Sequence, residues 1–139
     1  MKIVFADMDG LITLKVPVIQ PPVKISQQNN HETFKTLKYG DIVLLGDKGL
    51  RTVEWSSFFP VNKPFYNFVE YNARLNGNEY VNFLNEHSED CFRLIITEGF
   101  RTVINMLVVV DNFEYEYDKV GDIVYTLRLM EYPDNADRL

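Results

Sequence analysis

The sequence predicts a mainly β-structured domain of antiparallel strands, arranged as a barrel or sandwich with one flanking helix. Aromatic residues make up 14% of the 139 residues, and large rings pack well on a pleated sheet. Short apolar runs are separated by turn residues, and the best helical pattern is confined to about residues 78–88. We expect a single β-rich domain over residues 1–133, followed by a flexible tail or linker stub over residues 134–139.

The first element is a predicted hairpin around Asp7-Met8-Asp9-Gly10, because Asp-Gly between two strand-like runs is a strong hairpin signal. Alternate residues on either side of this turn are expected to flank it on one face: Ile3, Phe5, Leu11, Thr13 and Lys15. Pro17, Pro21 and Pro22 then exclude a helix and suit an exposed or edge segment.

The middle of the chain is expected to hold two short strands within residues 23–37, around Gln28-Asn29-Asn30, and a second hairpin over residues 41–59. The predicted turn of that hairpin is Gly46-Asp47-Lys48-Gly49, whose glycines are free to adopt positive φ. Residues 60–76 are rich in aromatics, and a short helix from Pro64 is possible because proline suits a first helical position.

The helix at 78–88 is predicted from Asn78 as its cap and from the spacing of Tyr80, Val81 and Leu84, which places them on one face. Two hairpins are expected after it, over residues 92–110 and 113–131. The second has clear alternation on each of its strands, which favours a fixed register. Its alternating residues are Phe113, Tyr115, Tyr117, Ile123, Tyr125, Leu127 and Leu129.

Charge and composition argue against several function classes. The net charge is −6 and the pI is near 4.9, which disfavours nucleic acid as the main partner. The apolar run MLVVV (106–110) is far shorter than a membrane span. Cys91 is the single cysteine, so no internal disulfide can form, and we expect it to be a buried small hydrophobe. No metal or cofactor is expected.

Asp7 and Asp9 follow a strand, as in the opening of haloacid-dehalogenase-like phosphatases. There the first aspartate would attack phosphorus and the second would donate a proton to the leaving group. Such an enzyme needs a parallel sheet with helical crossovers, and this chain has one good helix. His31 and His87 lie in unrelated contexts. The phosphatase is therefore a remote alternative to an Asp-rich hairpin tip, and no enzymatic activity is expected.

The aromatic segment 55–71 and the proline-rich stretch 17–22 are the candidate partner-contact surfaces. The aromatic candidates are Trp55, Phe58, Phe59, Phe65, Tyr66, Phe68 and Tyr71. A sheet-rich domain with aromatic surfaces and open strand edges suits assembly by packing and strand addition. Two alternatives stay open: the aromatics fill the core, or they line the groove of a glycan- or peptide-binding module.

Several short motifs follow one another along residues 11–133, each occurring once. They are GDKGLRTVEWSSFFP (46–60), RLIIT (93–97), Ile104-Asn105 with Val108, Phe113 with Tyr115, and YTLRLMEY (125–132). Together they resemble the N-terminal domain of the PBSX-type XkdP-like proteins of contractile phage tails, prophages and phage-tail-like particles. Many members continue into a LysM domain, whereas this sequence stops at Leu139, either as a truncated piece or as a short member of the family, so we do not expect a glycan-binding role here.

The resemblance implies a structural tail component that acts as an adaptor between the tail tube or hub and the baseplate. Its partners would be tube, hub and wedge proteins, together with further copies of itself in a ring. It implies a tube-like barrel as the preferred fold. The protein would be present in the bacterial cytoplasm during assembly and then in the virion or phage-tail-like particle, with no contact to nucleic acid or membrane.

Overall fold

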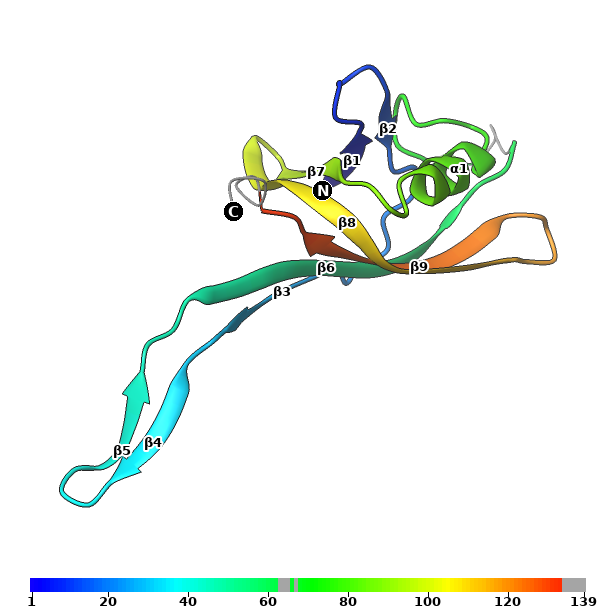
Figure 1. Cartoon of the computed structure of the whole chain (residues 1–139). Coiled ribbons are helices and arrows are strands. Elements are labelled where there is room, and N and C mark those ends of the chain that lie inside the picture. Colours follow the sequence, from blue (N-terminus) through cyan, green and yellow to red (C-terminus); the bar gives the residue numbers. More distant parts are fainter. Residues whose placement is uncertain (63–65, 67, 134–139) are drawn as a thin grey trace.

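The structure is a computed structural model that describes residues 1–62, 66 and 68–133. Within these residues the chain forms nine strands and one helix (Figure 1). In chain order they are β1 (Lys2–Ala6), β2 (Thr13–Lys15), β3 (Lys24–Asn29), β4 (Glu32–Thr36), β5 (Gly40–Leu44), β6 (Lys48–Phe59), α1 (Asn78–Glu86), β7 (Phe92–Glu98), β8 (Arg101–Tyr117) and β9 (Ile123–Glu131).

Seven strands form one sheet in the order β2-β1-β7-β8-β9-β6-β3, and β4 and β5 form a separate two-stranded ribbon. Every neighbouring pair in both sheets is antiparallel. The predicted mainly β fold with one helix is therefore confirmed. Residues 134–139 lie outside the described residues, so the expected domain limits stay a prediction.

The seven-stranded sheet is curled, but its two edge strands, β2 and β3, do not join in a ladder. Phe5 of β1 packs against Trp55 of β6 with ring centroids 6.2 Å apart, although β7, β8 and β9 lie between these strands in the sheet. Among the named strands the edges β2 and β3 do not pair with each other. The connection between them crosses the open side instead, where the buried Ser57 hydroxyl donates to the Val18 carbonyl at 2.8 Å. The barrel is thus only partly closed.

Large aromatic side chains fill the concave side of the curled sheet. The Phe83 ring of α1 stacks on Phe5 at 6.0 Å between centroids, and the Phe59 ring stacks on Tyr125 at 4.0 Å. The Trp55 indole donates a hydrogen bond to the Tyr125 hydroxyl at 2.8 Å, so this polar pair is satisfied inside the core. Burial raises the pKa of the Tyr125 hydroxyl, which therefore stays protonated at neutral pH.

Helix α1 buries the predicted face and begins with a different cap. Tyr80, Val81 and Leu84 are buried as expected, and Phe83 joins them. Asn78 was expected to be the cap, but Gly77 holds the cap position and Asn78 is the first helical residue. The Asn76 side chain accepts its backbone N–H at 3.1 Å and satisfies one of the free donors of the first turn. His87 lies at the C-terminal end, as expected.

The first hairpin forms as predicted, but the face of its second strand is wrong by one residue. Phe5 lies opposite Leu14 in the ladder. Leu14 is 4% exposed, whereas Leu11, expected to flank the turn on the side of Phe5, is 84% exposed. The loop is longer than the four-residue turn, because β2 begins only at Thr13, so Leu11 lies in the loop and outside the ladder.

The C-terminal third has one long strand where two separate hairpins were expected. β8 pairs with β7 along its first part and with β9 along its second part. The two ladders meet at Val108, and a register shift between Val110 and Asn112 lies within the β8–β9 ladder. The turn of the β8–β9 hairpin is as predicted, with Gly121 at φ 88°. Cys91 is half-buried rather than buried, and Pro64, the start of the possible short helix, lies outside the described residues.

Candidate assembly surfaces

The ribbon formed by β4 and β5 projects away from the body of the molecule and is here called the arm (residues 30–47; Figure 1). The chain continues from β3 into β4 and returns from β5 into β6. Each of these two extended segments is interrupted where the arm joins the body. The expected hairpin over residues 41–59 is therefore wrong, because β5 pairs with β4 while β6 pairs with β3 and β9. The true turn lies at the tip, where Gly40 has φ 73°.

Gly46 and Gly49 allow the two strands to come close where the arm joins the body. A Cβ atom on Gly46 would lie 1.6 Å from the Asn30 carbonyl oxygen, and one on Gly49 would lie 2.6 Å from the Gln28 carbonyl oxygen. Neither glycine has positive φ, in contrast to the prediction. These positions require glycine because a neighbouring backbone occupies the space of a side chain.

The arm has one mainly apolar face and one mainly polar face. Phe34 lies opposite Ile42 in the ladder, and the next pair on that face is Glu32–Leu44, so one carboxylate borders the apolar side chains. The other face carries the pairs Thr33–Val43 and Lys35–Asp41. No helix or further strand is packed on the arm within the described ranges, and Phe34 and Leu44 are 43% and 50% exposed.

Apolar side chains are also exposed at the two ends of the arm. Leu37 and Tyr39 at the tip are 111% and 72% exposed, and Leu45 near the base is 85% exposed. An isolated two-stranded ribbon is marginally stable in water, and a contiguous exposed apolar surface usually marks an interaction site. The arm therefore has the properties of a segment that is covered by another protein.

The structure separates the aromatic contact candidates into two groups. Trp55 and Phe59 are 2% and 0% exposed and belong to the core. Phe65 lies outside the described residues. Phe68 and Tyr71 are 54% and 82% exposed. For Phe68 and Tyr71, and for Phe58 and Tyr66 beside them, contact with a partner stays a prediction.

Phe58, Tyr66 and Phe68 form a surface cluster that is fixed to the end of the sheet. The Tyr66 and Phe68 rings stack at 4.9 Å, and Phe58 meets Tyr66 edge-on at 6.4 Å. The Tyr66 hydroxyl donates to the carboxylate of the buried Asp122 at 3.0 Å, and the Val61 N–H donates to the same carboxylate at 3.1 Å. The hydrogen bond to Asp122 raises the pKa of Tyr66.

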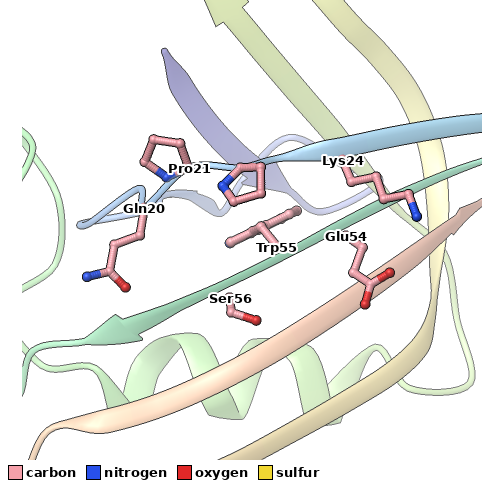
Figure 2. A pocket seen from close by; sticks show the side chains of 7 residues that line it. Gln20, Pro21, Lys24, Glu54, Trp55 and Ser56 are labelled. Atoms are coloured by element: carbon pink, nitrogen blue, oxygen red, sulfur yellow. The ribbon is translucent and has the colours of Figure 1, made fainter.

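Part of the proline-rich stretch lines a groove of about 570 Å³ beside β6 (Figure 2). It runs between Pro21 and Pro22 on one side and residues 54–56 on the other, and Lys24 and Glu54 face each other across the β3–β6 ladder. Trp55 contributes to the wall, but its ring is almost fully covered. The groove thus offers no exposed aromatic platform of the kind on which a sugar would stack.

Asp7 and Asp9 lie in the loop of the first hairpin. The Asp7 carboxylate accepts the N–H of Ile12 at 3.3 Å, which is a local turn contact. No cluster of three or more metal-ligating side chains is present among the residues that the structure describes. The antiparallel pairing of β1 with β2 and β7 also differs from the parallel sheet on which the phosphatase alternative depends. No helix in the described part of the chain is long and apolar enough to cross a membrane.

Comparisons with known proteins show a similarity in sequence and a similarity in fold. No protein-family profile matches the sequence. The chain is 26% identical over 133 residues to the uncharacterized protein YqbP of Bacillus subtilis (strain 168). This match covers 93% of the chain and 58% of YqbP, so the chain spans less than two thirds of that relative.

The fold is similar to that of a chain from the tail of an empty GTA particle with C6 symmetry. The TM-score is 0.57 at 14% identity, over 95% of this chain and 91% of the other. At this identity the similarity concerns the fold.

Proposed function

We propose that the chain is a structural subunit of a phage-like tail and that it assembles through its arm. The observation that carries this proposal is the uncovered apolar face of the β4–β5 ribbon, with Phe34 and Leu44 half exposed. A ribbon of this kind gains stability when a neighbouring protein covers it. The similarity of the whole fold to a chain of a sixfold-symmetric particle tail supports the same function.

Within such a tail we propose the role of an adaptor between the tail tube or hub and the baseplate, without catalysis. Its partners are then other tail proteins and further copies of itself in a ring. The curled body gives the subunit its shape, and the arm extends from it to contact a neighbouring protein. Each contact is weak alone and is strengthened by ring closure, because the last contacts form within one assembly. The protein is made in the bacterial cytoplasm and ends in the virion or phage-tail-like particle.

The test is to purify particles from the bacterium that encodes the chain and to follow a tagged copy of it. We expect the tag to sediment with intact tails and to be located by gold labelling at one position near the tail end. A chain that is absent from purified particles would refute the tail function. Labelling along the whole tail would refute the adaptor role and indicate a tube subunit.

A further inference from the structure

A groove beside helix α1 combines an apolar floor with an acidic rim. Leu14 of β2 and Phe83 of α1, each 4% exposed, form part of its floor, Ile12 at its edge is 46% exposed and supplies most of the open apolar surface, and its volume is about 310 Å³. Glu79 and Glu86, both exposed, line it from α1. Neither carboxylate forms an ion pair with another described residue.

Among the described residues that line this groove, Arg74 is the one cation and Glu79 and Glu86 are the two anions, so this described lining has a net charge of −1. Desolvating unpaired carboxylates is unfavourable, and a cation brought by a ligand would compensate them. The groove therefore fits a ligand that has a small apolar group next to a positive charge.

The tip of the arm has these two properties. Leu37 is 111% exposed and stands between Lys35 and Lys38 in the sequence, and Asp41, which lies opposite Lys35 in the ladder, leaves residues 35–41 with a net charge of +1. The Lys38 ammonium lies 5.4 Å from the centroid of the Tyr39 ring, which keeps it at the tip. A leucine flanked by two ammonium groups is complementary to an apolar floor rimmed by two carboxylates.

We propose that the arm tip of one copy docks into the α1 groove of a second copy, with Leu37 on the apolar floor and Lys35 and Lys38 against Glu79 and Glu86. Figure 1 places the tip and α1 at distant parts of one molecule, so the contact joins two copies. It uses different surfaces on the two partners, and such a contact repeats around a ring or along a line. This inference rests on the proposed function, because it identifies a second copy as the partner of the arm.

Carbodiimide cross-linking of the full chain tests the contact directly, since this reagent joins a lysine amine to a carboxylate at contact distance. Unlabelled and ¹⁵N-labelled chains are mixed at millimolar concentration and the linked peptides are identified by mass spectrometry. We expect mixed-label links from Lys35 or Lys38 to Glu79 or Glu86. Mixed-label links from the tip to other carboxylates, or no mixed-label links at all, would overturn the proposal.

Charge reversal provides the second test. Lys38→Glu is expected to weaken self-association, measured by sedimentation, by about tenfold, and Glu86→Lys to do the same. Combining the two should restore most of the loss, because the ion pair is re-formed with opposite polarity. Glu114→Lys, on the β8–β9 hairpin, is the matched control and should cause no specific loss. Equal association of the native chain and both single variants would overturn the docking site.

The two proposals fail in different ways. A chain that is incorporated into tails normally with Lys38→Glu and Glu86→Lys keeps its tail function and lacks this contact. A chain that never enters particles but gives the expected cross-links keeps the contact and lacks the tail function.

Discussion

The body and the arm are built from the same kind of antiparallel strand, yet they bury very different amounts of side chain. In β6 and β9 alternate residues are buried, including Val53 and Leu127 at 0% exposure. In β4 and β5 no residue is buried, although Phe34 lies between the polar residues Thr33 and Lys35 as a core residue of a strand would. The difference lies in what covers the apolar face: α1 and the opposite wall of the curled sheet in the body, and no element of the described chain in the arm.

This comparison shows that an alternating pattern specifies a strand with one apolar face and leaves open which protein covers that face. The body covers its own apolar face and is expected to fold independently. The arm is expected to open locally at low free-energy cost, because its hydrogen bonds are solvated and its side chains have few neighbours. Substitutions in the two regions should therefore separate folding from assembly.

The largest expected effect is on folding, from Trp55→Ala in the body. Removal of the indole leaves a cavity and deprives the Tyr125 hydroxyl of its buried donor. We expect the free energy of unfolding to fall by about 3–5 kcal/mol. Urea denaturation followed by far-UV circular dichroism measures this, because Trp55 is the single tryptophan and its fluorescence is lost.

If that variant does not fold, Trp55→Phe keeps a ring in place and should cost less. Tyr71→Ala is the matched aromatic control, since Tyr71 is 82% exposed, and it should change stability by no more than about 0.5 kcal/mol. Equal losses for Trp55→Phe and Tyr71→Ala would contradict the division between core and surface aromatics.

A smaller effect is expected at the junction of the two regions, from Gly46→Ala. The added methyl group would collide with the Asn30 carbonyl, so the strands must separate at the base of the arm. We expect a loss of about 1–3 kcal/mol, as for other overpacked sites, together with faster amide exchange in the arm than in the body. Asp47→Ala is the neighbouring control, and matching exchange in the two variants would show that close approach is not what requires glycine.

Burial of Glu131 acts to raise its pKa, but hydrogen bonds and the charge of Arg51 outweigh this effect and lower the pKa. The Arg51 guanidinium lies 3.0 Å from the carboxylate, at the base of the β6 ladder next to the arm. Because the folded pKa is depressed, the pair stabilises the fold above the ordinary carboxyl pKa of 4.5, and this contribution is lost as the pH falls through the lower folded value.

Glu131→Gln is accordingly expected to cost about 0.5–1 kcal/mol at pH 7. The difference between native and variant stability should shrink as the pH falls below about 4. Urea titrations at a series of pH values measure this, with Glu114→Gln as the control. A difference that stays constant from pH 7 to pH 3 would mean that Arg51 does not act through the carboxylate charge.

Much of the body could be predicted from the sequence because its signals are local. The helix face, the turn after β8 and the alternation of β9 all depend on residues within about ten positions of one another. The buried and exposed aromatics of β6 could also have been separated by period two, which places Trp55, Ser57 and Phe59 inward. This alternation ends with β6 at Phe59, so it is not visible when residues 55–71 are taken as one aromatic segment.

The arm could not be predicted in the same way. A Gly-x-x-Gly segment between two strand-like runs is compatible with a tight turn and also with a close crossing of two long strands. The two cases differ only in which distant strand pairs with each run. Likewise, exposure of Phe34 and Leu44 depends on the absence of a covering layer, which the alternation of the segment itself does not encode.

The smallest expected effect on folding, and a large one on assembly, comes from Phe34→Ser. Phe34 is 43% exposed on the apolar face of the arm, so its removal should change the free energy of unfolding by less than about 0.5 kcal/mol. If a neighbouring protein covers that face, the same change removes apolar area from the contact and should weaken incorporation into particles by tenfold or more. Thr33→Ser, on the polar face of the same strand, is the matched control for both measurements. Loss of stability without loss of incorporation would mean that the arm belongs to the fold and not to the assembly, because an aromatic residue that matters only within the monomer must be covered by the monomer itself.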